Sequence, residues 1–412
     1  MTHTRVITMH TKRILSCVLL LASVLCVFFW STLSQISGYG AVYPQATRIQ
    51  DRHKTNSETG AASPTFRRVI LDMFGHRPNA SEVSNSNGSS SSSVAGALTK
   101  HILLVTYYRG GSTFLGEIFA QHPDAFYWFE PLRGLLGNVY GELGEYKPKV
   151  KHFLNMEEQY LRKSSDTFVE LSPDVIWNRT RVLEAVLRCH VHSLPNWLLS
   201  DSFVKEAAHM PKMKPFSACL TFARTPINKE RCLFVLTALC SVYPITVLKT
   251  IRYPVYALEE FFARVPDAYV IYYVRDPRGI MSSRKELHHF RSAHLSLFAQ
   301  NLCDAMMRNH EHFVRMREKF PDRLTMLRYE DLALSPRQMA ERLYRFVGLM
   351  IPEEILTWIR LNTAERRRGG PFATKRNSSE AAMSWRQNLD EREKDVISDK
   401  CKDVLNLYGY SK

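Results

Sequence analysis

The segment at residues 101–131 (HILLVTYYRGGSTFLGEIFAQHPDAFYWFEP) constrains the fold more than any other part of the sequence. Its apolar, β-branched run at 101–108 predicts a strand. Apolar residues recur at three- and four-residue spacing from Phe114 onwards, which predicts a helix that ends before Pro123. Residues 109–113 (RGGST) lie between the two elements. The sequence therefore predicts a strand, a glycine-containing turn and a helix, in the manner of a P-loop.

The RGGST turn combines several groups that bind anions. The first N–H groups of a helix lack intrahelical partners and lie at the positive end of its dipole. Gly110 and Gly111 allow the backbone to approach a ligand, Arg109 adds a cation, and Ser112 and Thr113 add hydroxyls. The turn is not a G-x-x-x-x-G-K-[ST] loop, so no metal is expected. We predict a phosphate-binding type of site, the alternative being an ordinary turn with a surface arginine.

A second apolar run, at residues 268–274 (AYVIYYV), ends in a similar way. It is followed by Arg275 and then by a segment that includes Ser283, which predicts a second strand leading into a helix. Ligands of α/β sheets bind at the carboxyl ends of parallel strands. We therefore expect Arg275 and Ser283 to form a second anion pocket beside the first.

These two loops resemble those of the Golgi carbohydrate 6-O-sulfotransferases. Residues 108–114 (YRGGSTF) are similar to the family's 5′-phosphosulfate loop, and Val274-Arg275-Asp276-Pro277 with Ser283 is similar to its 3′-phosphate motif. Ser384-Trp385-Arg386 also resembles that family, and the resemblance covers about residues 103–407. One difference is that the family loop more often reads Arg-Ser-Gly-Ser-Ser, so one hydroxyl is missing here.

The resemblance implies a donor, an acceptor and a set of residues. The donor is 3′-phosphoadenylyl sulfate, and the acceptor is the 6-hydroxyl of galactose, N-acetylgalactosamine or N-acetylglucosamine in a keratan, chondroitin or N- or O-linked glycan. Sulfuryl transfer is expected to be an in-line displacement without a metal, in which Arg109 supports charge on the leaving phosphate. The residues expected to bind the donor are Arg109, Gly110, Gly111, Ser112, Thr113, Phe114, Leu115, Arg275, Asp276, Pro277, Arg278 and Ser283.

Glu130 is the candidate general base for the sugar hydroxyl. It follows the expected strand at 125–129, and its apolar neighbours Trp128 and Phe129 are expected to raise its pKa. The alternative is a structural carboxylate paired with Arg133.

Other polar residues have open roles. Lys249 and Arg252 end another expected strand and would contact the donor, contact an acidic acceptor, or form a solvated edge. Residues 329–331 (YED) are interpreted as the start of a helix, and Trp385 and Arg386 as a cover for the adenine or a wall of the acceptor groove.

The N-terminal sequence and the charge indicate a membrane-anchored, lumenal protein. Residues 14–33 form an uncharged, mostly apolar run long enough to span a bilayer, preceded by Lys12 and Arg13. We predict a cytoplasmic tail at 1–13, a signal anchor at 14–33, a flexible Ser-rich stem at 34–100 and a lumenal domain at 101–412, in a type II Golgi glycoprotein. The formal charge of +15 favours anionic partners, and the lumenal location excludes nucleic acid.

Cysteines and sequons agree with a lumenal location. Six cysteines lie outside the expected span, which permits up to three disulfides and 15 connectivities, and we expect at least one bridge. The sequons begin at Asn79, Asn87, Asn178 and Asn377.

Beyond the first unit, strands are expected at 245–251, 268–274 and 324–329, and helices at 179–190, 257–264 and 293–320 and from 335. This alternation predicts an α/β fold with a mostly parallel sheet and helices on both faces. The remaining functional alternatives are a glycosyltransferase, a lumenal kinase and a non-catalytic glycan-binding protein. The first two are disfavoured because the sequence has no Asp-x-Asp motif and no kinase signature.

Overall fold

The computed structural model describes residues 99–135, 159–161, 168–170, 173–194, 210–223, 225–287, 292–363 and 377–410. These residues contain a five-stranded sheet of order β2-β5-β1-β6-β7, in which every neighbouring pair is parallel. Its strands are β1 (Lys100–Thr106), β2 (Ala125–Phe129), β5 (Ile245–Thr250), β6 (Ala268–Val274) and β7 (Leu324–Arg328). A separate antiparallel pair consists of β3 (Gln159–Leu161) and β4 (Phe168–Glu170).

The central strands are buried on both faces. All six residues of β5 are buried, and the same is true of β1 from its second residue onwards. A parallel sheet covered on both sides has continuous apolar strands rather than alternating ones. This explains why the unbroken apolar runs of the sequence predicted these strands well.

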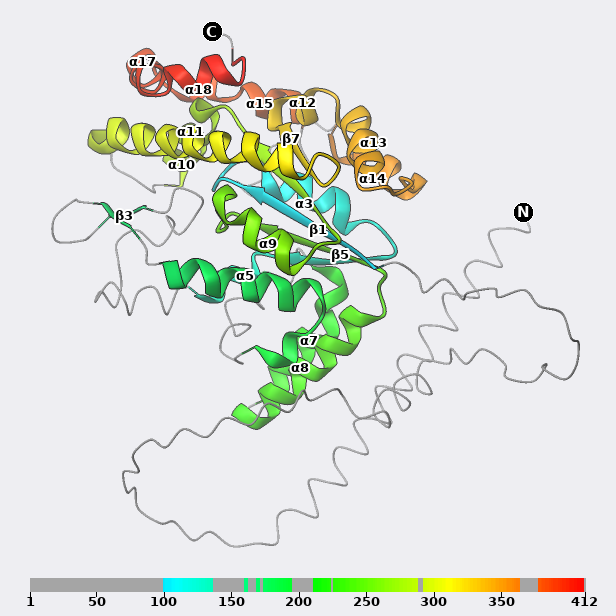
Figure 1. Cartoon of the computed structure of the whole chain (residues 1–412). Coiled ribbons are helices and arrows are strands. Elements are labelled where there is room, and N and C mark those ends of the chain that lie inside the picture. Colours follow the sequence, from blue (N-terminus) through cyan, green and yellow to red (C-terminus); the bar gives the residue numbers. More distant parts are fainter. Residues whose placement is uncertain are drawn as a thin grey trace, which may run out of the picture. The chain divides into compact units, whose positions relative to one another are not determined.

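Helices cover the two faces of the sheet. The connection from β1 to β2 contains α3 (Ser112–Ala120), and the connection from β5 to β6 contains α9 (Leu258–Arg264). The two connections cross the sheet in opposite directions, so right-handed crossovers place α3 and α9 on opposite faces. Next to α9 lies α5 (Pro173–Leu187), as Figure 1 shows, whereas α14 (Glu353–Thr363) packs against α3.

The described residues form ten further α-helices. They are α7 (Lys214–Phe222), α8 (Pro226–Ser241), α10 (Pro277–Glu286), α11 (Leu295–Lys319), α12 (Tyr329–Leu334), α13 (Pro336–Phe346), α15 (Ser378–Met383), α16 (Trp385–Asn388), α17 (Glu391–Lys400) and α18 (Lys402–Leu407).

Three disulfides join these helices. Cys219–Cys232 connects α7 to α8, and Cys189–Cys240 connects the end of α5 to α8. Cys303–Cys401 connects α11 to the start of α18. All six cysteines outside the predicted span are therefore paired, and the expectation of at least one bridge is confirmed.

The predicted α/β fold with a mostly parallel sheet is confirmed, and most differences concern the ends of elements. The strand bounds at 125–129 and 268–274 agree with the structure, whereas β1 ends two residues earlier than expected. Tyr329 begins α12 instead of ending β7, and α5 begins six residues before the expected helix. Ser335 occupies the cap position of α13, although within the described residues its side chain makes no capping hydrogen bond.

The predicted span at 14–33 and most of the predicted stem at 34–100 lie outside the described residues. Asn79 and Asn87 lie there as well. Among the residues that are described, no helix is both long and apolar enough to cross a membrane.

Candidate active site

The turn between β1 and α3 is closely packed against its neighbours. Gly111 caps α3 in the left-handed region, with φ of +83°, and Arg109 has φ of +65°. A Cβ atom at Gly111 would lie 2.3 Å from a ring carbon of Tyr329, and one at Gly110 would lie 2.5 Å from the hydroxyl oxygen of Thr106. Both positions therefore require glycine for steric reasons, and Gly111 also requires it for its backbone conformation.

The two predicted anion pockets are joined by direct hydrogen bonds. A terminal nitrogen of the Arg275 guanidinium donates to the carbonyl oxygen of Arg109 at 2.9 Å. In turn, Nε of Arg109 donates to the hydroxyl of Ser283 at 2.9 Å. Because β1 and β6 are adjacent parallel strands, the residues that follow them leave the same edge of the sheet. The structure thus brings Arg109, Arg275 and Ser283 into one site.

The Arg275 side chain is fixed by its surroundings. Its guanidinium carbon lies 4.5 Å from the centre of the Tyr329 ring, within the range of a cation–π interaction. Gly279 gives it room, because a Cβ atom there would lie 2.9 Å from Nε of Arg275. This Nε atom is buried and has no hydrogen-bond partner among the described residues.

Glu130 forms a buried ion-pair cluster at the neighbouring strand ends. Its two carboxylate oxygens accept hydrogen bonds from Lys249, at 2.5 Å, and from Arg252. Lys249 lies opposite Phe129 in the parallel pairing of β5 with β2, so this cluster depends on sheet order. Burial by itself raises the pKa of Glu130, but Lys249, Arg252 and Arg133 reverse the effect, and the net pKa is lower than usual. The expectation of a raised pKa is wrong for this reason, and Glu130 is held as the carboxylate.

Tyr108 connects the Glu130 cluster to the turn. Burial raises the pKa of its phenol, and Arg109, Arg284, Arg252 and Glu130 all act on it electrostatically. Its carbonyl oxygen accepts from Nε and a terminal nitrogen of Arg284, at 3.3 and 3.1 Å. The cluster, the turn and α10 are therefore parts of one polar region.

Comparison with known protein sequences identifies the family of this chain. The sequence matches the sulfotransferase family over residues 102–353. This chain belongs to the sulfotransferase family. It is 27% identical to carbohydrate sulfotransferase 1 of Danio rerio, over 75% of this chain and 77% of the relative. It is 25% identical to carbohydrate sulfotransferase 5 of Mus musculus, over 75% and 80%, and 24% identical to carbohydrate sulfotransferase 3 of Homo sapiens, over 76% and 67%. The predicted carbohydrate sulfotransferase family and the prediction of an enzyme are confirmed.

Solved sulfotransferase structures are similar at a lower level. The sulfotransferase domain of the Synechococcus PCC 7002 olefin synthase is 14% identical, with a TM-score of 0.38, over 73% of this chain and 94% of that domain. Mouse sulfotransferase SULT7A1, complexed with PAP, is 12% identical, with a TM-score of 0.34, over 76% and 89%. The sheet order of this sulfotransferase and its family match carry the assignment of its fold.

The backbone of the sulfotransferase loop modifies one expectation. The N–H groups of residues 110–114 were all expected to face the donor. Instead, the N–H of Gly110 donates to the carbonyl of Tyr107 at 2.8 Å, and that of Phe114 donates to the carbonyl of Gly111 at 3.1 Å. The N–H groups of Gly111, Ser112 and Thr113 precede the first intrahelical bond and remain candidates for the donor. The Phe114 and Leu115 side chains belong to the core.

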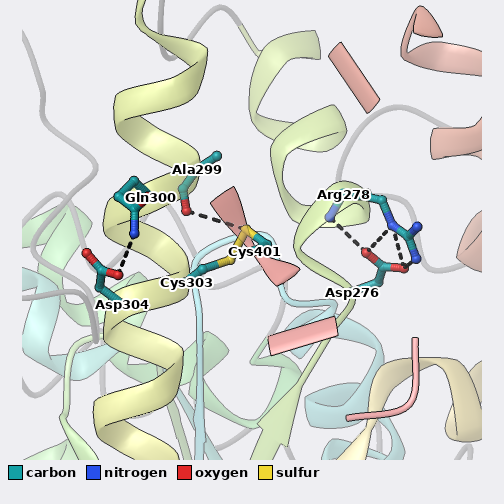
Figure 2. The surroundings of a disulfide bond; sticks show 7 residues. All are labelled: Asp276, Arg278, Ala299, Gln300, Cys303, Asp304 and Cys401. Atoms are coloured by element: carbon teal, nitrogen blue, oxygen red, sulfur yellow. Dashed lines mark hydrogen bonds and ion pairs between the residues drawn. A yellow bond between two sulfur atoms is a disulfide. The ribbon is translucent and has the colours of Figure 1, made fainter. Parts of the chain in front are cut away.

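Asp276 and Arg278 pair with each other at the start of α10. The Asp276 carboxylate accepts from the backbone N–H of Arg278 at 2.8 Å and from its guanidinium at 2.8 Å, as Figure 2 shows. Arg278 also lies over the Trp385 ring at 4.2 Å and donates to the carbonyl of Tyr410. Pro277 is the first residue of α10. Donor contacts by this segment remain a prediction, and the geometry favours a role in fixing the start of α10.

Sequence reasoning missed two residues of this region, Tyr329 and Arg284, and one ion-pair cluster. Tyr329 was assigned to the end of a strand and the start of a helix, with no role in the site, although it follows β7 at the same sheet edge as Arg275. Arg284 was passed over, although it is fully buried against the turn. Lys249, Arg252 and Glu130 were all noted, but the pairing of Glu130 with the two cations was not expected. The position of Tyr329 directly after a parallel strand was the available signal.

The run of three arginines at residues 366–368 lies outside the described part of the chain. Within the described part, no group of three His, Cys, Asp or Glu residues is placed to hold a metal ion. The absence of a metal from the reaction stays a prediction.

Proposed function

We propose that this enzyme transfers a sulfuryl group from 3′-phosphoadenylyl sulfate to a hydroxyl of a glycan. The observation that carries the proposal is the hydrogen bond from Arg275 to the carbonyl of Arg109, together with the bond from Arg109 to Ser283. A donor with a 5′-phosphosulfate and a 3′-phosphate on one ribose needs two anion sites side by side. The names of the curated relatives support a carbohydrate acceptor.

In the proposed reaction, the sugar oxygen attacks sulfur while the bond from sulfur to the bridging phosphate oxygen breaks. The hydroxyl proton passes to the carboxylate of Glu130, and the products are a glycan sulfate ester and 3′-phosphoadenosine 5′-phosphate. By analogy with phosphoryl transfer, the transition state is loose and is stabilised by positioning and charge. Arg109 and the N–H groups of Gly111, Ser112 and Thr113 would stabilise the charge on the leaving phosphate.

The proposed acceptor is the 6-hydroxyl of galactose, N-acetylgalactosamine or N-acetylglucosamine. A primary hydroxyl has a pKa far above that of a carboxylate, so Glu130 would accept the proton as the oxygen–sulfur bond forms rather than before it. Burial alone would raise the pKa of Glu130, but Lys249 and Arg252 lower the net pKa, so the proposed base is weaker than an ordinary glutamate.

Transfer assays test the proposed function. Purified full-length enzyme is incubated with ³⁵S-labelled donor and a panel of desulfated keratan, chondroitin and N- and O-linked glycans. We expect label on at least one glycan, with the ester at the 6-position by mass spectrometry. We also expect the rate to fall strongly in Arg275→Met, which removes the charge but keeps an unbranched side chain. Failure to label any glycan would contradict the proposal.

We further propose that the enzyme is a type II Golgi membrane protein with its catalytic domain in the lumen. The apolar run at 14–33 after Lys12 and Arg13 supports this orientation. The pairing of all six remaining cysteines supports an oxidising compartment. An epitope at the C-terminus should resist protease in intact Golgi vesicles and become sensitive when detergent is added. Digestion without detergent would contradict this orientation.

A further inference from the structure

Tyr329 lies between the two anion pockets. Its ring carbons Cδ2 and Cε2 lie 2.3 and 2.5 Å from the position that a Cβ atom would take at Gly111, so the ring rests on the α-carbon of that glycine. The same ring lies under the guanidinium of Arg275, with 4.5 Å between the ring centre and the guanidinium carbon. Tyr329 is itself buried, with 6% of its surface exposed.

The residue after Tyr329 strengthens this arrangement. A carboxylate oxygen of Glu330 accepts the backbone N–H of Asp276 at 3.0 Å, and Glu330 is buried. Tyr329 and Glu330 together therefore contact the turn after β1 and the residues after β6. Tyr273 packs edge-on to Tyr329, with 6.3 Å between ring centres, and limits the freedom of the ring.

We propose that Tyr329 is a positioning residue that sets the distance between the phosphosulfate loop and Arg275, and thereby makes the enzyme selective for 3′-phosphorylated nucleotides. An arginine side chain has many rotamers, and a ligand that must order it binds less tightly. The aromatic face holds the Arg275 guanidinium in the orientation that also reaches the Arg109 carbonyl. This inference rests on the proposed function, since it assigns Arg275 to the 3′-phosphate.

Nucleotide selectivity tests the proposal. The affinities of full-length enzyme for 3′-phosphoadenosine 5′-phosphate and for adenosine 5′-monophosphate are measured by calorimetry. In Tyr329→Leu, the loss of affinity for the first nucleotide should exceed the loss for the second by roughly tenfold, as expected for a desolvated cation–π contact. Tyr329→Phe keeps the ring and should retain most of the wild-type selectivity. Equal losses for both nucleotides would overturn the proposal, because they would indicate general damage to the site.

A double-mutant cycle tests whether Tyr329 acts through Arg275. In an Arg275→Met background, Tyr329→Leu should change the affinity for 3′-phosphoadenosine 5′-phosphate by less than about twofold. A further loss as large as that in the wild-type background would overturn the proposal.

The outcome remains clear even if Tyr329→Leu fails to fold. Fluorinated phenylalanines at position 329 keep the size of the ring but weaken the negative potential of its face, so selectivity should fall stepwise with fluorination. Unchanged selectivity across that series would overturn the proposal. Failure of the proposed function would look different, because wild-type enzyme would then bind both nucleotides equally.

Discussion

At the scale of single residues, the site contains two buried carboxyl groups whose pKa values are shifted in opposite directions. At Glu130, burial raises the pKa, but Lys249 and Arg252 bring it to a net value below the usual one. At Glu330, burial raises the pKa, and the opposing hydrogen bond from Asp276 and the charge of Arg275 do not cancel the effect. Sequence alone gave no means of separating them, because the cations near Glu130 come from β5, whose place beside β2 is a property of the folded sheet.

Glu130→Gln should lower kcat by about 10²- to 10⁴-fold, the usual contribution of a general base. The affinity for 3′-phosphoadenosine 5′-phosphate should change little, because Glu130 lies outside the two anion pockets. The acid limb of the wild-type rate should lie below the normal pKa of glutamate, because the carboxylate is stabilised in the fold. Pre-steady-state kinetics measure the rate and its pH dependence, and calorimetry measures the nucleotide affinity. A structural role alone would instead reduce thermal stability while leaving kcat of the folded fraction near normal.

Glu330→Gln should stabilise the fold at neutral pH. A carboxyl group whose pKa is raised on folding contributes stability below its unfolded pKa and loses that contribution as pH rises through its folded pKa. Glutamine keeps the oxygen that accepts the Asp276 N–H but does not ionise. Urea unfolding should therefore show a gain at pH 7 that shrinks towards pH 4. A variant that is less stable at both pH values would contradict this account of Glu330.

At the scale of elements, the turn between β1 and α3 was predictable because its function depends on local sequence. A strand, two glycines and a helix start are all visible in residues 101–120, whereas the contacts of the folded turn with Tyr329, Arg275 and Ser283 come from distant segments. Helix α8, by contrast, was not predicted from the sequence. Phe234 and Val235 are partly exposed, whereas Cys232 and Cys240 are buried in disulfides, so its apolar residues do not form one face. Thr225, which caps it, and Pro226 were the local signals available.

Gly111→Ala should abolish tight nucleotide binding. An alanine at position 111 would place its methyl group against the Tyr329 ring. It would also have to keep the left-handed conformation of Gly111, which costs about 1–2 kcal/mol for residues other than glycine. Gly348→Ala is the matched control, since Gly348 has φ of +64° and a Cβ atom there would meet only the end of the Lys100 side chain. Both variants should lose stability in urea, but only Gly111→Ala should lose affinity for 3′-phosphoadenosine 5′-phosphate by calorimetry. Equal affinity in the two variants would contradict the assigned role of the turn.

At the scale of the whole molecule, the C-terminal segment is attached to the start of α10. Arg278 contacts Trp385 and the carbonyl of Tyr410, and the Cys303–Cys401 disulfide ties this segment to α11 (Figure 2). Neither connection could be derived from the sequence, which left 15 disulfide connectivities open. The long separation between the contacting residues explains why, since no local pattern reports contacts of that kind.

Removal of the Cys303–Cys401 bridge should destabilise the enzyme more than removal of Cys219–Cys232. The two bridges close segments with sequence separations of 98 and 13 residues. Loop entropy in the unfolded chain predicts losses of about 4–5 kcal/mol and about 3 kcal/mol respectively. Urea unfolding of the paired Cys→Ser variants measures both free energies. A larger loss for the shorter segment would show that native packing, rather than chain entropy, dominates.

The central claim is that two interlocked anion pockets hold one nucleotide that carries phosphates at both its 3′ and 5′ positions. The most direct measurement compares the binding of 3′-phosphoadenosine 5′-phosphate, adenosine 5′-monophosphate and adenosine 3′-monophosphate to full-length enzyme by calorimetry. The bisphosphate should bind at least about a hundredfold more tightly than either monophosphate, because each pocket adds charge-assisted hydrogen bonds. Similar affinities for all three nucleotides would contradict the claim that Arg109 and Arg275 serve a single ligand.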